Sequence, residues 1–412
     1  MFSKLPPEVC RTLAGIPRII DEIAPVPARF RKDLHKNIRD LSELLTSGRQ
    51  SLSGKYLGSP AHFSAYLRYF LPWNLFRLCK LFTGTVPLFS ADTAGNAPIV
   101  ITDLGSGPLT LPVALWISMP ALREKNIEFR CFDINRHILK TGEQLFEKIA
   151  GAHTKANAGR GNGGQWKIKT VASSLTEARP EARNEKKSTL VTAVNVYNEL
   201  YWKLNAADTD ALAAFADGEA ARLASFCGAD GAVLIVEPGI PRSGTFIARI
   251  RDRFIERGFS IDAPCTHHAD CPMETSKVQR RSAKWCHFTF PADDAPRSLR
   301  DLSSAARLPK EDGVLSFLLA RRGEKGGKQD PAPSRAAAVP VRISSGVFPL
   351  PDMRYARYGC SEKGLVLLAG SREEINPRHS GSTVSIPLTG TEPRDKKSGA
   401  LIAKIPARQS RR

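Results

Sequence analysis

Cysteines gather in one stretch of this sequence and recur once later. Three of them, Cys265, Cys271 and Cys286, lie in the segment APCTHHADCPMETSKVQRRSAKWCHFTF, and a fourth candidate, Cys360, stands in RYGCSEKGLVLL. Thiolates concentrated in a polar, proline-containing loop suit a soft metal, because sulfur ligands select zinc or iron–sulfur clusters. The spacing fits neither a paired C-x-x-C zinc ribbon nor a bacterial ferredoxin motif, so it leaves both kinds of centre open.

Other residues near these cysteines offer alternative chemistry. Three histidines could complete a zinc site, namely His267, His268 and His287. The string Asp262-Ala263-Pro264-Cys265 spells the nucleophile motif of RNA cytosine-5 methyltransferases. It follows the expected fifth strand and its helix, whereas those enzymes place it after the fourth strand, so metal ligation is the favoured role of Cys265. The other cysteines lie singly in apolar surroundings and are expected in the core; they are Cys10, Cys79, Cys131 and Cys227.

A second constellation is a glycine loop in the string IVITDLGSGPLTLPVAL. An apolar strand runs into Asp103, Gly105 and Gly107, and the two glycines would let the backbone turn sharply and approach a ligand closely. A dinucleotide motif would need glycine where Thr110 stands, so the pattern favours S-adenosylmethionine. One crossover later, Asp133 ends the next strand, where a carboxylate can accept hydrogen bonds from ribose hydroxyls.

The loop also departs from the usual pattern. Leu109 occupies a position where many methyltransferases have a third glycine, and the Asn-Pro-Pro-Tyr loop of amino-directed enzymes is missing after the fourth strand. Asn195 and Glu199 lie in that region and could contact substrate or cofactor, or could serve as helix caps. The catalytic residues are therefore unassigned.

These residues need a doubly wound sheet to position them. From Ile99 onward, short apolar runs alternate with helical stretches, which is typical of parallel strands covered on both faces. We predict an α/β, Rossmann-like S-adenosylmethionine methyltransferase fold over residues 91–296, preceded by a helical domain over residues 1–90. Residues 297–340 are expected to form a basic linker, and residues 341–412 a small β-rich unit with a basic tail.

Composition narrows the partners and the compartment. The formal net charge of +19 in 412 residues implies a polyanionic partner, with RNA as the first choice. The run Lys277 to Arg281 and the tail residues Arg408, Arg411 and Arg412 are expected to contact phosphates. No stretch has the length and apolarity of a membrane span, and the first residues lack a secretion signal. The chain is expected to be a bacterial cytoplasmic monomer, with the mitochondrial matrix as the alternative.

The blocks VEPGIPRSGTFIARIRDRF, APCTHHADCPM and WCHF, with the upstream DLGSGP and the later RYGCSEKG, carry a resemblance. They resemble the methyltransferase-like family of mitochondrial small-ribosomal-subunit assembly factors and their bacterial relatives, over roughly residues 51–367. The resemblance implies that Cys265, Cys271, Cys286 and Cys360 hold a [4Fe-4S] cluster. It also implies binding to the small subunit's ribosomal RNA during assembly.

Two functions fit these residues. The first is a small-subunit assembly factor with a methyltransferase fold and a four-cysteine iron–sulfur cluster, using S-adenosylmethionine or only its scaffold. The second is an active ribosomal RNA methyltransferase with a structural zinc site. The absence of a recognisable catalytic motif favours the first, while the set Asp103, Gly105, Gly107 and Asp133 favours the second.

Overall fold

The structure is a computed structural model that describes residues 1–26, 31–46, 56–84, 86–89, 98–156, 164–180, 186–204, 209–274, 284–323 and 338–405. The chain divides into two compact units. One comprises Phe2–Ala206 with Pro291–Gly313, and the other comprises Ala207–Phe290 with Val314–Arg412 and Met1. We call them the cofactor unit and the thiol unit. Within the described ranges, no helix is long and apolar enough to cross a membrane.

The cofactor unit begins with helices, as the sequence predicts. They are α1 (Pro7–Ile23), α3 (Leu34–Leu44), α4 (Pro60–Ala65) and α5 (Leu71–Phe82), with short turns η2 (Tyr56–Gly58) and η3 (Tyr66–Phe70). Helix α1 starts at a proline, which needs no backbone N–H donor there. Its buried residues recur at helical spacing and form one apolar stripe: Val9, Leu13, Ile16 and Ile20.

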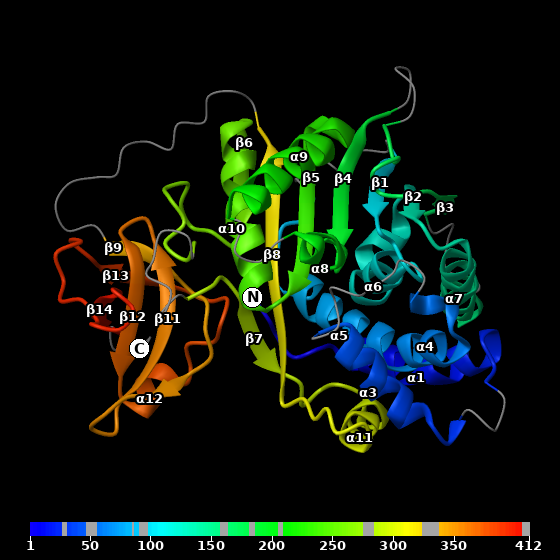
Figure 1. Cartoon of the computed structure of the whole chain (residues 1–412), viewed down its shortest axis with the longest axis horizontal. Helices are drawn as coiled ribbons and strands as arrows, with labels where there is room; N and C mark the ends of the chain where they lie inside the picture. Colours follow the sequence, from blue (N-terminus) through cyan, green and yellow to red (C-terminus); the bar gives the residue numbers. More distant parts are fainter. Residues whose placement is uncertain are drawn as a thin grey trace. The chain divides into compact units, whose positions relative to one another are not determined.

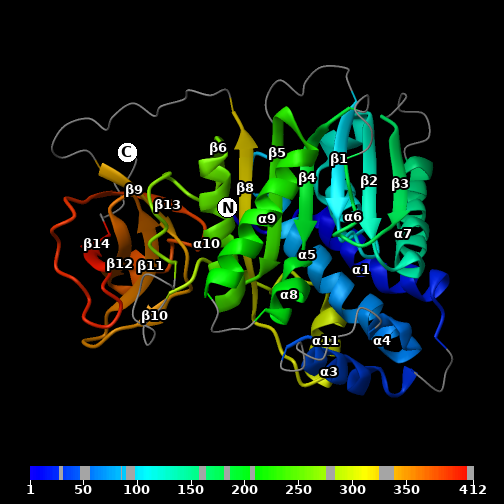
Figure 2. The same cartoon turned by 45° about the horizontal axis from the view of Figure 1, so that its top comes forward.

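Four parallel strands form the sheet of this unit. They are β1 (Ile99–Leu104), β2 (Ile127–Asp133), β3 (Trp166–Ala172) and β4 (Ser188–Val194), in the order β3-β2-β1-β4 (Figures 1 and 2). Every residue of β1 is buried, whereas β3 at the edge of the sheet has exposed residues. The connecting elements are α6 (Thr110–Ser118), η5 (Pro120–Glu124), α7 (Arg136–Ala156), α8 (Tyr197–Leu200) and η6 (Tyr201–Lys203). This order is that of Rossmann-type sheets.

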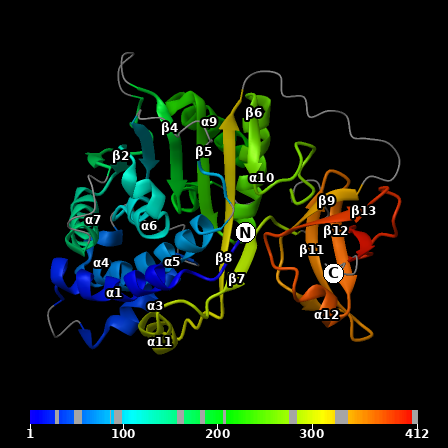
Figure 3. The ribbon, with the colours of Figure 1, turned by 180° about the vertical axis from the view of Figure 1, so that it is seen from behind.

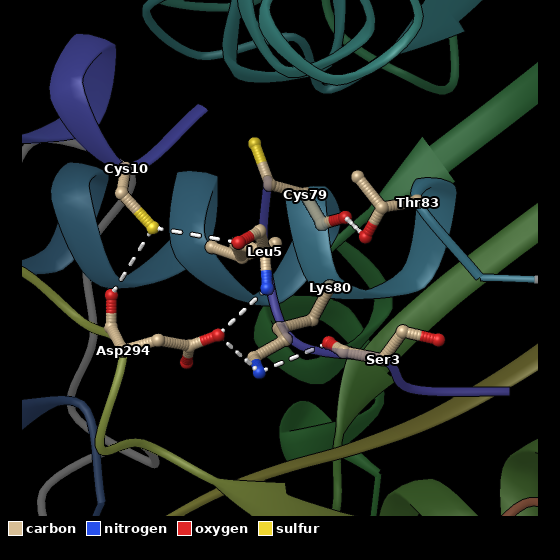
Figure 4. Close-up of polar contacts among 7 residues, drawn as sticks. All are labelled: Ser3, Leu5, Cys10, Cys79, Lys80, Thr83 and Asp294. Carbon is tan, nitrogen blue, oxygen red and sulfur yellow. Dashed lines mark hydrogen bonds and ion pairs between the residues drawn. The ribbon is translucent and has the colours of Figure 1, made fainter. Parts of the chain in front are cut away.

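A late segment of the chain completes the cofactor unit. Pro291–Gly313 contains α11 (Arg297–Ala305) and returns to the N-terminal helices. Figure 4 shows the Asp294 carboxylate between the Leu5 N–H, at 2.8 Å, and the Lys80 ammonium, at 2.6 Å. Nearby, the Trp73 indole N–H donates to the Ser303 hydroxyl.

The prediction of a linker over residues 297–340 is therefore wrong for the first part of this range. Residues 297–305 form α11, and β8 (Asp312–Arg322) follows, while residues 324–337 lie outside the described residues. Helix α11 is so polar that only Leu299 and Ser303 are buried, which is why its composition suggested a linker.

The thiol unit contains α9 (Thr209–Phe226), β5 (Cys227–Pro238), α10 (Pro241–Glu256), β6 (Phe259–Ala263), β7 (Phe288–Pro291) and most of β8. The order is β5-β8-β6, and β8 runs antiparallel to both neighbours. β8 therefore lies inside the sheet, between β5 and β6, and makes the sheet mixed, which is common among large sheets.

A second sheet in the thiol unit forms the C-terminal β-rich part. Its strands are β9 (Ala338–Ile343), β10 (Phe348–Pro349), β11 (Tyr355–Ser361), β12 (Gly364–Gly370), β13 (Thr383–Pro387) and β14 (Leu401–Lys404), with α12 (Arg372–Ile375) after β12 (Figure 3). The order is β13-β9-β11-β12-β14, with β10 beside β11. One apolar cluster includes Val341, Val366 and Tyr355, and another includes Leu367, Phe348 and Tyr358. The predicted Rossmann-like fold, with its helical N-terminal part and β-rich C-terminal part, is confirmed.

Candidate functional site

The glycine loop connects β1 to α6 and has the backbone that glycine permits. Gly105 and Gly107 have φ of +74° and +52°, in the left-handed region. A Cβ added to Gly105 would lie 2.5 Å from the Val196 side chain, so this position has no room for any other residue. Leu109, where a third glycine was expected, also has a positive φ of 54° and is fully buried. The loop therefore keeps its left-handed turn at Leu109 without a glycine.

Asp133 ends β2 and faces this loop. One carboxylate oxygen accepts a hydrogen bond from the Gly107 N–H at 2.9 Å, and the other accepts from the Asn135 N–H at 2.8 Å. Burial raises the pKa of Asp133, and these two backbone donors oppose that rise. The carboxylate is thus held in one orientation with acceptor capacity left over.

Asp103, the fourth residue predicted to bind the cofactor, does not line the cavity beside the loop. Its side chain is 1% exposed and accepts a hydrogen bond from the Thr192 hydroxyl at 2.6 Å. Burial raises the pKa of Asp103 to about 6. Because the Ser106 hydroxyl also donates to the Asp103 backbone carbonyl, Asp103 supports the loop from behind.

A cavity of about 310 Å³ opens at the carboxyl ends of β1, β2 and β4, and we call it the cofactor pocket. Its size lies at the lower end of the usual range for small-molecule sites. Gly105, Gly107 and Asp133 line it, as do Asn195 and Glu199. The sequence reasoning missed several further lining residues, because their contribution depends on how the N-terminal helices fold back: Tyr56, Tyr66, Asn74, Ile134, Ser174 and Thr176.

Acidic and aromatic groups meet inside the cofactor pocket. The Tyr56 hydroxyl donates to the Glu199 carboxylate at 2.9 Å. Burial raises the pKa of both Tyr56 and Tyr66, and the charge of Glu199 raises each further. With Asp133 on the opposite strand end, two carboxylates border the cavity and favour a ligand that carries positive charge.

In the thiol unit, the four predicted cysteines line one small pocket, which we call the thiol pocket. Cys265 and Cys271 lie in the loop after β6, Cys286 precedes β7, and Cys360 lies in β11. Cys360 thus joins the other three although a long segment of sequence separates them. The same pocket is lined by Arg251, Arg342, His267 and Met273.

The thiols and arginines of the thiol pocket influence one another. Burial raises the pKa of Cys271 to about 12 and those of Cys286 and Cys360 as well, and the neighbouring Cys265 raises all three further. Burial alone would lower the pKa of Arg251, but Cys265, Cys271 and Asp252 raise it. Without a bound cation, buried thiols of this kind stay protonated near neutral pH.

The histidines considered as zinc ligands lie in different surroundings. His267 lines the thiol pocket, and burial lowers its pKa to about 4, so it is neutral at physiological pH. His268 Nε2 accepts from the Ile261 N–H at 3.0 Å, and His287 Nδ1 lies 3.0 Å from the Trp285 carbonyl. In the part of the chain that the structure describes, no group of three or more His, Cys, Asp or Glu side chains is arranged to hold a metal ion.

Two expectations about RNA contacts fall outside this description. The run Lys277 to Arg281 and the tail residues Arg408, Arg411 and Arg412 lie outside the described residues.

Asp262, part of the apparent nucleophile motif, pairs with Arg321 at 2.6 Å, and Cys265 lies among the other thiols.

The family model for the mitochondrial small ribosomal subunit protein Rsm22 matches residues 91–347. The chain belongs to this family. The match contains the glycine loop and three of the four cysteines of the thiol pocket, and it ends before Cys360. The family resemblance predicted from the sequence is therefore confirmed for Rsm22.

Solved structures add distant likenesses. A methyltransferase from Pyrococcus furiosus is 10% identical with a TM-score of 0.28, covering 56% of this chain and 79% of its own. A S-adenosylmethionine-dependent methyltransferase from Geobacter sulfurreducens, in complex with S-adenosyl-L-homocysteine, is 10% identical with a TM-score of 0.29, covering 60% and 96%. At such values they add nothing to what the strand order of this Rsm22-family chain shows. No match was found among curated proteins.

Proposed function

We propose that the chain is an assembly factor of the small ribosomal subunit that binds S-adenosylmethionine in the cofactor pocket and a [4Fe-4S] cluster in the thiol pocket. Its family is that of the mitochondrial small ribosomal subunit protein Rsm22. The net charge of +19 suits a partner rich in phosphate. The partner is the ribosomal RNA of the assembling subunit. The family's description favours the mitochondrial matrix over the bacterial cytoplasm as the compartment.

The observation that carries the cofactor assignment is the orientation of Asp133 by the glycine loop. Both carboxylate oxygens are fixed by backbone donors and can still accept from ribose hydroxyls. Ile134 follows directly, is 66% exposed and lines the cavity, so it offers an apolar face to an adenine ring. Asp133 and Glu199 suit a ligand with sulfonium and ammonium charges. When bound, S-adenosylmethionine supplies an electrophilic methyl group.

Methyl transfer to ribosomal RNA is a second candidate function. Asn195, at the end of β4 in the cofactor pocket, has a φ of 55°. Backbone strain of this kind at a non-glycine residue often occurs at ligand sites. Transfer of labelled methyl groups from S-adenosylmethionine to small-subunit RNA would favour this candidate, and binding without transfer would favour the assembly factor.

As the structure describes them, the side chains of the thiol pocket are not arranged around a metal ion, but their donor type and charge suit a metal centre. Four thiols of suitable type line one cavity, and metals bind thiolates. Four thiolates around an iron–sulfur cluster leave net negative charge, which the guanidinium groups of Arg251 and Arg342 can offset. A zinc ion held by three thiolates and His267 is the alternative.

The cofactor assignment is tested by calorimetry with S-adenosylmethionine. We expect the wild-type chain to bind it and Asp133→Ala to lose at least tenfold in affinity, because two ribose hydrogen bonds disappear. Asp301→Ala is the matched control, since this aspartate of the same unit is 70% exposed and should leave binding unchanged. Equal affinity in the Asp133 variant would contradict the assignment.

A further inference from the structure

A further cavity, of about 330 Å³, lies in the thiol unit, and four of its ten lining residues carry aromatic rings. Trp285 and His287 are stacked with ring centroids 4.8 Å apart, and Phe348 and Tyr358 are stacked at 5.1 Å. All four residues line the cavity, together with Lys284 and the hydroxyl-bearing Ser344 and Ser345. We call this cavity the aromatic pocket.

The backbone around the aromatic pocket is held by side-chain hydrogen bonds. The Trp285 indole N–H donates to the Gly239 carbonyl at 3.0 Å, and the Ser316 hydroxyl donates to the Cys286 carbonyl at 2.7 Å. On the other wall, the Tyr358 N–H donates to the Ser345 hydroxyl at 2.8 Å. The Trp285 ring and the backbone of Tyr358 are thus held in place by the fold, which lowers the cost of ordering this site on binding.

Successive side chains of the segment Trp285–His287 line different cavities. Cys286 lines the thiol pocket, whereas Trp285 and His287 line the aromatic pocket. The aromatic pocket is therefore a separate site with its own chemistry, although Met273 lines both cavities.

A positive charge at the wall of the aromatic pocket indicates which kind of ligand it binds. The Lys284 ammonium lies 4.7 Å from the centre of the Tyr358 ring, at the wall of the cavity. Among the residues that the structure describes, it has no carboxylate partner within ion-pair distance. Aromatic faces beside a cation are how proteins bind single-stranded nucleic acid, because bases stack on the rings and the cation contacts phosphate.

We propose that the aromatic pocket binds one unpaired base of an RNA strand, with Lys284 on a flanking phosphate. The inference rests on the proposed function in that it takes RNA as the partner of this chain. It adds a second kind of contact, in which the chain recognises an unstacked nucleotide instead of only the phosphate backbone. Stacking accepts any base, so the pocket detects that the RNA is single-stranded more than it reads its sequence.

Phe348→Leu is the variant that tests this pocket. Leucine keeps the apolar contacts of Phe348 in its cluster with Tyr358 and Leu367 but removes the aromatic face. Affinity for a short single-stranded RNA, measured by fluorescence anisotropy, should fall roughly 5- to 150-fold, which is the range for one lost base–aromatic stack. Phe348→Tyr should bind like the wild type. Tyr355→Leu is the matched control, because Tyr355 lies on β11, the strand that pairs with β10, but packs in the other apolar cluster.

A backbone of equal length without bases separates stacking from charge. The abasic strand should bind wild type and Phe348→Leu equally, because both keep the same phosphate contacts. Lys284→Gln should weaken binding to both strands and reduce the salt slope by about 0.7. The inference is overturned if Phe348→Leu weakens the abasic strand as much as the RNA, or if it leaves RNA binding unchanged.

The proposed function fails by a different measurement. Cosedimentation of the wild-type chain with small ribosomal subunits tests the partner, whatever the Phe348 variants do. If the chain cosediments but binds single-stranded RNA with no dependence on bases, the aromatic pocket is not a base site and the proposed function stands. Base-dependent binding to single-stranded RNA without cosedimentation would support the pocket and overturn the assigned partner.

Discussion

Removing one partner of the ion pair between Lys80 and Asp294 should strongly destabilise the cofactor unit. The two side chains are 3% and 13% exposed, and their charged atoms are 2.6 Å apart. Lys80 also donates to the Ser3 carbonyl, and Asp294 also accepts from the Leu5 N–H. We predict that Lys80→Met lowers the free energy of unfolding by about 3–5 kcal/mol, because it leaves a buried carboxylate without its cation.

The magnitude follows from what remains around Asp294. After the substitution, one carboxylate oxygen keeps the Leu5 N–H, while the other, Oδ1, has no hydrogen-bond partner in the described part of the chain even now. Adding Asp294→Asn removes the uncompensated charge and retains an acceptor for Leu5. The double variant should therefore be more stable than Lys80→Met by about 1–3 kcal/mol.

Urea unfolding followed by tryptophan fluorescence measures these differences, and hydrogen exchange of the first ten residues localises them. Trp73, 2% exposed in the same helix as Lys80, is a suitable reporter. The control is Asp301→Ala, which removes a 70% exposed partner of Arg297 and should change stability by less than about 0.5 kcal/mol. A loss below 1 kcal/mol in Lys80→Met, or a double variant no more stable than it, would refute the reasoning.

Two further predictions concern the predicted site residues. The folded-state pKa of Asp103, about 6, lies above its unfolded value, so its contribution to stability is present at low pH and lost as pH rises from about 4 to about 6. The stability of Asp103→Asn relative to wild type should therefore increase by up to about 3 kcal/mol between pH 4 and pH 7, measured by urea titration at each pH, and a constant difference would contradict this. Anaerobically purified protein should contain iron and sulfide in equal amounts, and both should be lost on serine substitution at any thiol-pocket cysteine but kept in Cys131→Ser. The cysteines to substitute are Cys265, Cys271, Cys286 and Cys360. Zinc without iron would mean that the cluster is absent. Full metal content in Cys360→Ser would make His267 the fourth ligand.

The sheet could be predicted from the sequence because its strands are nearly continuous apolar runs. Strand β1, buried along its whole length, illustrates this pattern, and Asp133 at the end of β2 follows from the same reasoning. Helix α11 could not be predicted, because its burial is limited to Leu299 and Ser303 and its composition resembles that of a linker.

The candidate sites could likewise be predicted only in part. Thiol chemistry indicated a metal site at the cysteines near residue 270, but it could not show that Cys360 lies beside them, because β11 reaches the thiol pocket only through sheet pairing. Tyr56 and Tyr66 gave no sign of a ligand site, since an aromatic-rich helical segment usually forms core. Asp103 matched a cofactor motif, yet it points to Thr192 behind the loop.

The return of Pro291–Gly313 to the N-terminal helices has a consequence for how the chain is made. Asp294 follows Lys80 by 214 residues, so a ribosome needs roughly 10 to 40 s after Lys80 to deliver its partner. Until then, a buried lysine and the backbone of Leu5 lack the group that satisfies them. The cofactor unit cannot finish folding before residues 207–290 of the thiol unit have left the ribosome. Nascent chains that end before residue 291 should therefore be the species that chaperones bind and proteases remove.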